Sequence, residues 1–373
     1  MVPPPPPQAP PQYAPPPPSP VAVEPTPIPR GGKIKVALLL PLSGPSSALG
    51  QGMLDAAMLA LYDTGANRIE LMPRDTGANP QTAAHAARSA IEDGVRLIIG
   101  PLLAADVAAV KPVAAGARVP MLAFSTTTEL AGNGTYLLSF QPDQEIARIV
   151  GYARSRGIER FAIFAPHTPY GDLATAAMQR IVTQDQASLN VIGNYGTDVA
   201  TLSDAARRFA AQGTNYDAIL LPDGGARLKA LAPLLSYDGI SPRRVHYLGT
   251  GLWDDPSLGD EPGLIGGWYA ASDPRGRADF ERRFRAAEGH SPPRLATLAY
   301  DATALAADLA KNPAGPDFSA SALTNPSGFV GLDGVFRLNR DGLVQRELAV
   351  LQIGPNGPQV IDPAAQSFGG RGE

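Results

Sequence analysis

The sequence predicts an α/β protein with two doubly wound parallel-sheet lobes, and three observations lead to this fold class. From residue 33 onward, short apolar runs alternate with amphipathic helical stretches, which is typical of parallel strands covered by helices on both faces. The alternation occurs in two series, each about the size of one doubly wound domain. The chain has 373 residues and is 44% hydrophobic, which suffices for two large cores.

The first 30 residues differ in composition from the rest of the chain. They hold 15 of the 39 prolines and only two charged residues, Glu24 and Arg30. Proline runs favour the polyproline II conformation and offer no backbone donors for a helix or sheet. We therefore expect 1–32 to be a disordered, proline-rich spacer that tethers the folded part. An unstructured tail and a ligand for a proline-binding module are the alternatives.

The first series runs from residue 33 to about 143. It opens with an apolar strand at 33–40, followed by a helix whose apolar residues Leu54, Ala57, Met58 and Leu61 share one face. Further strands are expected at 69–73, 95–99 and 119–124, with helices at 81–93 and 105–116 between them. Pro112 is expected to kink or end the second of these helices.

The second series begins near residue 144 and repeats the same rhythm. Helices are expected at 144–156, 171–184, 202–212 and 226–235, and strands at 160–165, 191–193, 217–221 and 245–248.

The remaining segment, 273–353, offers two helices, at 278–288 and 295–310, and two strands. The turn Asn339-Arg340-Asp341-Gly342 indicates a hairpin of 334–338 with 347–353. Because this segment is too short for a third domain, we assign its helices to the first lobe and its hairpin to the second. The predicted division is 33–143 with 273–325 for lobe 1, 144–272 with 326–360 for lobe 2, and a flexible tail at 361–373. Three crossovers would join the lobes.

Composition and motifs exclude several kinds of function. The net charge of -4 argues against a nucleic-acid partner, and the absence of cysteine excludes thiolate metal sites and cysteine nucleophiles. Gly249-Thr250-Gly251 follows a strand but lacks the helix-opening glycine of a dinucleotide site. His167 is the one candidate base, and a solvated loop histidine explains it better. We predict no enzyme activity, no metal and no cofactor, and the longest apolar run, 36–42, is too short to span a membrane.

Small polar residues follow the predicted strands, where a ligand would bind. Ser43 follows the first strand, Ser125 to Thr128 follow the fourth, and Tyr170 opens a helix of the second series. Hydroxyls and backbone N–H groups at helix starts suit anionic or amide ligands, and the same residues can also serve as N-caps. Trp253 either covers a ligand in the cleft or packs in the core.

Five segments together resemble the leucine/isoleucine/valine-binding family of type I periplasmic binding proteins. They are 35–44 (KVALLLPLSG), Gly50-Gln51-Gly52, 97–102 (LIIGPL), 119–130 (VPMLAFSTTTEL) and 162–172, which ends in Tyr-Gly-Asp. The resemblance covers about 33–355. It implies two Rossmann-like lobes joined by three crossovers, with a ligand in the cleft between them.

The resemblance also implies particular ligand contacts. Thr126, flanked by Ser125 and Thr127, and Tyr170 match the family's ligand-binding threonine and tyrosine. Three positions differ: Asp106 stands at or near a serine position, Leu49 replaces a tyrosine, and Gly251 replaces the acidic residue that meets the ligand ammonium. Asp106 or Asp223 is a candidate for the missing charge. The predicted ligand-binding residues are Ser43, Asp106, Ser125, Thr126, Thr127, Tyr170, Gly251 and Trp253.

Two functions follow from the resemblance. The first is a periplasmic protein that binds a small amino-acid-like or amide solute for uptake through an ABC permease. The alternative is a penicillin-binding-protein activator, a lipoprotein that carries a binding-protein-like domain on a proline-rich stalk and regulates peptidoglycan synthesis. Its partner would be a penicillin-binding protein. Its only membrane contact would be a lipid anchor on a cysteine preceding residue 1.

Overall fold

The computed structural model describes residues 32–312 and 315–368. The described residues from Lys33 onward form one compact unit by their backbone contacts. The predicted spacer lies outside the described residues, apart from Gly32.

The first sheet, which defines lobe 1, is five-stranded and parallel throughout. Its strand order is β2-β1-β3-β4-β5. In register, Ile34 of β1 is opposite Ile69 of β2, and Val36 is opposite Leu97 of β3. The inner strands β3 and β4 are buried along their whole length, and β1 is buried apart from Lys35, which explains their apolar sequences. The strands are β1 (Ile34–Leu40), β2 (Ile69–Asp75), β3 (Leu97–Ile99), β4 (Met121–Ala123) and β5 (Thr135–Leu137).

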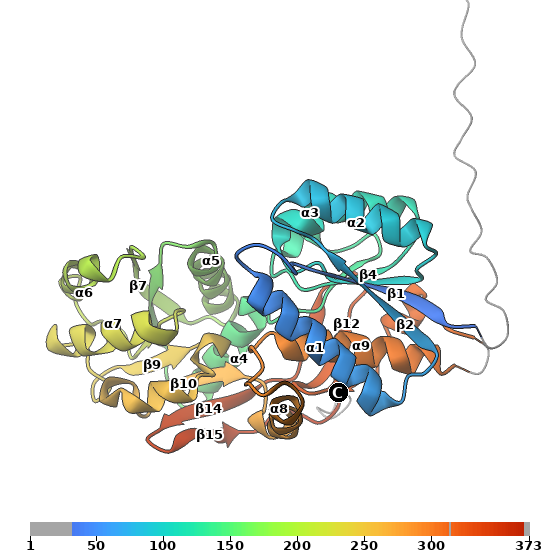
Figure 1. Cartoon of the computed structure of the whole chain (residues 1–373). Helices are drawn as coiled ribbons and strands as arrows, with labels where there is room; N and C mark the ends of the chain where they lie inside the picture. Colours follow the sequence, from blue (N-terminus) through green and yellow to red (C-terminus); the bar gives the residue numbers. More distant parts are fainter. Residues whose placement is uncertain (1–31, 313–314, 369–373) are drawn as a thin grey trace, which may run out of the picture. The chain divides into compact units, whose positions relative to one another are not determined.

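Helices lie on both faces of this sheet (Figure 1). Helices α2 (Pro80–Glu92) and α3 (Ala104–Gly116) pack together on one face, and α1 (Ser47–Thr64) packs against α9 (Ala296–Ala310) on the other. Helix α8 (Pro274–Glu288) joins α1 through a cluster that contains Phe280, Phe284 and Ala56. Helix α3 continues past Pro112, where the sequence suggested a kink or an end.

The second sheet, which defines lobe 2, has seven strands in the order β15-β14-β10-β9-β8-β6-β7. The strands β6 to β10 are parallel, whereas β14 and β15 run antiparallel along one edge. One face packs on α4 (Pro142–Ser155) and α5 (Pro169–Gln184), and the other on α6 (Leu202–Ala210) and α7 (Gly225–Tyr237). The strands are β6 (Arg160–Pro166), β7 (Ser188–Tyr195), β8 (Ala218–Leu220), β9 (His246–Gly249), β10 (Trp268–Ala271), β14 (Ala349–Gly354) and β15 (Gly357–Asp362).

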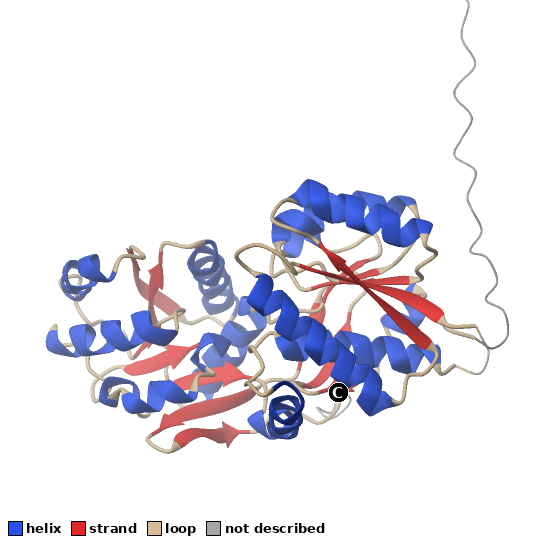
Figure 2. Cartoon of the chain, in the orientation of Figure 1, coloured by secondary structure: helices blue, strands red, loops and turns tan. Residues whose placement is uncertain are grey.

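Each sheet of the chain's two lobes thus lies between layers of helices, as the α/β prediction requires (Figure 2). The chain passes from the first sheet to the second after β5 and returns after β10. The fold class predicted from the sequence is confirmed. The exact lobe boundaries stay a prediction, which the two separate sheets support. No described helix is long and apolar enough to cross a membrane.

A third sheet of three strands follows α9 and the short helix α10 (Ala320–Leu323). It consists of β11 (Phe329–Gly331), β12 (Gly334–Leu338) and β13 (Val344–Arg346), all antiparallel. The predicted hairpin is therefore wrong in its second strand. The short turn sets Leu338 opposite Val344, so the pairing is complete by Arg346, and the chain then leaves to pair β14 with β10.

The predicted flexible tail is also wrong for 361–368. Asp362 ends β15 and forms a 2.7 Å ion pair with Arg148, and Ala364 belongs to the core of lobe 2. The Arg337 guanidinium lies over the ring of Phe368. Residues 369–373 lie outside the described part.

Candidate functional site

Close contact between a strand end and the following helix recurs in the first βα unit of each lobe. A Cβ atom at Gly50 of α1 would lie 2.1 Å from the Pro41 carbonyl oxygen, and one at Gly171 of α5 would lie 1.9 Å from that of Pro166. Only glycine allows this approach. In lobe 2 it places Tyr170, in the first turn of α5, at the carboxyl edge of the sheet.

Polar groups from three elements of lobe 2 meet around Tyr170. Its hydroxyl donates a 2.9 Å hydrogen bond to Oγ1 of Thr250, which follows β9, and lies 3.4 Å from Oε2 of Glu145 in the first turn of α4. The backbone N–H of Gly251 donates to the same Oε2 at 3.0 Å. The buried carboxylate of Glu145, on α4, therefore lies at the end of β9. The family resemblance did not associate this helix with the site.

Glu145 and Gly251 occupy adjoining space. A Cβ atom on residue 251 would lie 2.5 Å from Oε1 of Glu145, so this carboxylate fills the place that a side chain at 251 would take. Glu145 is 4% exposed, and burial raises the pKa of its carboxyl to about 7 against the opposing effects of the Gly251 N–H and Arg294. No hydrogen bond from the described part of the chain reaches Oε1.

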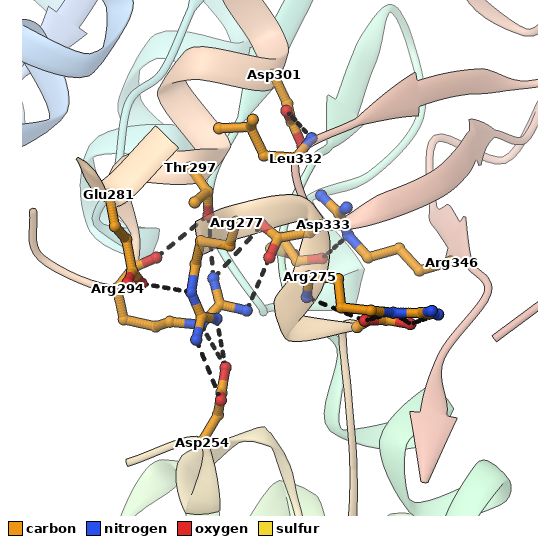
Figure 3. A network of polar contacts seen from close by, with 12 residues as sticks. Asp254, Arg275, Arg277, Glu281, Arg294, Thr297, Asp301, Leu332, Asp333 and Arg346 are labelled. Atoms are coloured by element: carbon orange, nitrogen blue, oxygen red, sulfur yellow. Dashed lines mark hydrogen bonds and ion pairs between the residues drawn. The ribbon is translucent and has the colours of Figure 1, made fainter. Parts of the chain in front are cut away.

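Beside this group, Asp254 anchors a network of ion pairs (Figure 3). It follows the short helix η3 (Gly251–Trp253), its side chain is 2% exposed, and it accepts from Nη2 of Arg277 at 3.2 Å and Nε of Arg294 at 3.1 Å. Arg277 belongs to α8 and Arg294 precedes α9, and both helices pack on α1. These ion pairs therefore connect the end of a lobe 2 strand to helices of lobe 1.

The network continues into the third sheet. Arg294 also pairs with Asp333 at 2.9 Å, and the buried Arg346 guanidinium lies over the ring of Phe140. Burial and the nearby Asp333 raise the pKa of Asp301 to about 7, and burial lowers the pKa of Arg346.

The carboxyl edge of lobe 1 is arranged differently. Thr76 follows β2 and is 0% exposed, and Asp106 lies in the first turn of α3 and is 2% exposed. In the described chain, Oγ1 of Thr76 and Oδ2 of Asp106 are buried without a hydrogen-bond partner. Burial raises the pKa of the Asp106 carboxyl, with the nearby Thr76 hydroxyl acting in the opposite direction.

The structure brings together only some of the predicted site residues. Tyr170 and Gly251 meet around Glu145, and Oγ of the buried Ser125 accepts the Thr127 N–H at 3.1 Å. Ser43 is exposed, and its N–H donates to Asp75. Thr126 is half-buried. That these residues of the two lobes face one ligand stays a prediction.

Two expectations about individual side chains need correction. Trp253 does not cover a ligand: it is 1% exposed, packs against Tyr269 in the core of lobe 2 and donates from Nε1 to the Leu221 carbonyl. Asp223 does not supply the charge missing at residue 251, because it is bound to Arg227 and to the Tyr195 hydroxyl. Within the described residues, no group of three or more potential metal ligands occurs.

The position of Glu145 could have been noticed in the sequence. It precedes Ile146, Ile149 and Val150, which form the buried face of α4, and itself lies on that face. An acidic residue at a buried helical position is rare without a partner. It was overlooked because Asp or Glu in a first helical turn is ordinary and is explained by the helix dipole.

The two sheets form two α/β lobes, and each has polar groups at the carboxyl edge, where doubly wound sheets bind ligands. The sequence profile of a family described as "Periplasmic binding protein" matches residues 33–358. The chain therefore belongs to the periplasmic binding protein family.

Solved structures share the fold at low sequence identity. A putative branched-chain amino acid ABC transporter protein from Rhodospirillum rubrum is 18% identical, with a TM-score of 0.75 over 88% of this chain and 100% of that one. A leucine binding protein from Thermotoga maritima is 21% identical, with a TM-score of 0.63 over 88% and 97%. A solute binding protein from Rhodopseudomonas palustris BisB5, in complex with 3,4-dihydroxybenzoic acid, is 18% identical, with a TM-score of 0.68 over 90% and 98%.

Among curated proteins, an uncharacterised protein of Rickettsia prowazekii is 22% identical over 178 residues. The match covers 48% of this chain and 47% of that protein, so it spans about half the length of each.

Proposed function

We propose that this protein is a non-catalytic solute-binding protein of the bacterial periplasm that holds a small amino-acid-like or amide solute between its lobes for an ABC-type permease. Family membership supports the class. The observation that carries the proposal is that buried hydroxyl oxygens at the carboxyl edges of both sheets, Oγ1 of Thr76 after β2 and Oγ of Ser272 after β10, lack partners within the described chain. Such edges are where ligands bind in doubly wound sheets.

The proposed site draws on both lobes. Lobe 1 contributes the segment Ser125 to Thr127, with Asp106 and Ser43 on the same edge. Lobe 2 contributes Tyr170 and the backbone at Gly251. If the lobes close around a solute, hydrogen bonds to the ligand would replace the hydrogen bonds to water at both edges.

A thermal-shift screen of amino acids, amides, small peptides and aromatic acids tests this function. A ligand at a hundredfold excess over its Kd stabilises the folded state by about 2.7 kcal/mol. For a chain of this size, such a gain raises the Tm by at least a few degrees. Thr126→Val should abolish the shift, whereas Thr183→Val, which removes an exposed hydroxyl on α5, should leave it unchanged.

The alternative function, a penicillin-binding-protein activator anchored by a lipid, has two supporting observations. One is the proline-rich composition of 1–30. The other is Asp254, whose ion pairs with Arg277 and Arg294 oppose separation of the lobes. If no solute changes the Tm and the protein binds a bifunctional penicillin-binding protein, the activator function is supported instead.

A further inference from the structure

A buried cluster of charged residues lies among the segments that connect the two lobes (Figure 3). The chain passes between the two large sheets three times: after β5, after β10, and through the third sheet before β14. Phe140, on the first of these segments, has the guanidinium of Arg294 4.2 Å from its ring centroid and that of Arg346 at 5.1 Å. Arg294 precedes α9 of lobe 1, whereas the N–H of Arg346, on β13, donates to Gln144 of α4 in lobe 2. A movement of one lobe relative to the other therefore rearranges this cluster.

Two buried carboxylates, Asp301 and Asp333, belong to the same cluster. Asp301 lies on α9 and is 2% exposed, and Asp333 lies in the turn between β11 and β12 and is 0% exposed. Oδ1 of Asp301 accepts the N–H of Leu332 in this turn at 2.7 Å, and a Cβ atom at Gly331 would lie 2.4 Å from Oδ2. Within the described chain, Oδ2 of Asp301 and both terminal nitrogens of Arg346 are buried without a hydrogen-bond partner. The Asp301 carboxylate is thus packed against the turn that carries the second carboxylate.

The two carboxylates are not equivalent. Asp333 forms an ion pair of 2.9 Å with Arg294. The burial of Asp333 is outweighed by attraction to Arg294 and Arg346, so the pKa of its carboxyl lies below its usual value. Burial and the neighbouring Asp333 raise the pKa of Asp301 to about 7, against the effects of Arg346 and the Leu332 N–H. The pair therefore holds one proton near neutral pH, and Asp301 is its weaker acid.

We propose that Asp301 and Asp333 form a pH-sensitive switch for the orientation of the two lobes. The proton held by the pair favours the arrangement described above. Its loss favours an arrangement in which the lobes turn about the connecting segments and water reaches both carboxylates. The reason is that two like charges buried together are costly, so ionisation favours any conformation that hydrates them. Within the described chain, the charged groups that act on the pair are Arg294 and Arg346, with Arg277 acting on Asp333 and Glu145 acting on Arg346 at longer range.

Fluorescence energy transfer between the lobes tests the proposal. The chain contains no cysteine, so two introduced cysteines would be its only thiols. Ala108→Cys on α3 and Ala176→Cys on α5 would place one dye at an exposed position of each lobe. Energy transfer would be titrated between about pH 5 and pH 9 at constant ionic strength, with no solute present. We expect it to change in one step with its midpoint near pH 7, the pKa of Asp301.

Variants of the labelled chain identify the group that titrates. Asp301→Asn keeps an oxygen for the Leu332 N–H but cannot ionise, so it should hold the low-pH value of energy transfer at every pH. Asp308→Asn, at an exposed position of the same helix, is the matched control and should leave the midpoint unchanged. Because the pKa of Glu145 is also about 7, Glu145→Gln is included and should keep the transition.

A second variant at the pair guards against misfolding of the first. Asp333→Asn removes the like charge beside Asp301, so the midpoint should move to lower pH by about one unit or more. Circular dichroism would establish that each variant is folded.

Three results would overturn the switch. One is energy transfer in the wild type that stays constant over the whole pH range. Another is a transition that persists unchanged in Asp301→Asn. The third is a transition that Glu145→Gln abolishes and Asp301→Asn does not, which would assign the titration to Glu145. Because no solute is present, none of these outcomes depends on whether the proposed solute-binding function is correct.

Discussion

The carboxyl edges of the two sheets differ, although the βα units that begin the two lobes are alike. Gly50 and Gly171 allow the same close approach of helix to strand end in lobes 1 and 2. At the edge of lobe 2, Tyr170 and Gly251 already donate hydrogen bonds to Glu145, and Asp254 is paired with Arg294. At the edge of lobe 1, Thr76 and Asp106 leave buried atoms unpaired.

This difference indicates how the two edges would contribute to binding. In lobe 2, Tyr170, Gly251 and Asp254 are fixed before a ligand arrives, so little ordering of these groups remains when one binds. Lobe 1 holds hydrogen-bonding capacity that a ligand or water would satisfy. Loss of a paired group such as Asp254 should therefore lower stability, whereas loss of the poorly compensated charge of Asp106 should raise it.

The largest effect is expected at Asp254. Asp254→Asn removes the buried carboxylate that the half-buried guanidinium groups of Arg277 and Arg294 share, and loss of one partner from a buried ion pair costs about 3–5 kcal/mol. The free energy of unfolding from urea titration would measure this. Asp204→Asn, in an exposed pair with Arg207, should cost less than about 1 kcal/mol. Equal, small losses at both sites would show that the Asp254 network does not stabilise the fold.

The second effect concerns Glu145 and depends on pH. Its pKa rises from 4.5 in the unfolded chain to about 7 in the folded protein, so the folded state binds the proton more tightly. As the pH rises from 4.5 to 7, the free energy of unfolding of the wild type should therefore fall by on the order of 3 kcal/mol. Glu145→Gln removes this loss, and should exceed the wild type in stability at pH 8 and match it at pH 4. A stability difference independent of pH would contradict the buried, ionisable state of Glu145.

A third effect is steric and is expected at residue 251. Gly251→Ala places a Cβ atom against Oε1 of Glu145, and overpacking of this kind costs about 1–3 kcal/mol. In a double-mutant cycle, Glu145→Ala should remove most of that cost. Gly151→Ala, in α4 with open space around its Cβ position, should instead be neutral or stabilising. Additive losses at 145 and 251 would mean that the two residues do not compete for space.

The smallest effect is expected at the edge of lobe 1. Asp106→Asn should raise stability near pH 7 by about 1 kcal/mol, because it removes a buried charge with an unpaired oxygen. Since burial raises the pKa of Asp106, the advantage of the variant should fade as the pH falls through that pKa. Unfolding titrations at several pH values would show this trend. A loss of stability would mean that Asp106 is bound more firmly than its contacts indicate.

Much of the fold could be predicted from the sequence because buried parallel strands leave an unmistakable apolar pattern. The runs that became β1, β3, β6 and β9 are of this kind. Strand β10 was missed because its four residues follow two glycines and carry no periodic signal. The strand predicted to pair with 334–338 was wrong for a different reason. A short turn indicates that two strands pair, but it does not give the bounds of the second strand.

The candidate site was less predictable because charge pairing across the chain leaves no local pattern. Tyr170 was found through its position at the start of a helix after a strand, and Gly251 through the family resemblance. Glu145 is 106 residues from Gly251, and Asp254 is 40 residues from Arg294. Such pairs depend on how separate elements pack, so their partners could be identified only in the folded structure.

The order of the elements along the chain has a consequence for synthesis. Helix α1 is covered by α9, and strand β10 of the second sheet pairs with β14, which begins at Ala349. A growing chain that has not yet reached residue 296 therefore exposes an apolar helix face in its first lobe and an unpaired strand edge in its second. Lobe 1 can complete its packing only after α9 has been synthesised, and lobe 2 only after β14 has been synthesised. This topology favours folding of both lobes together over folding of one lobe at a time.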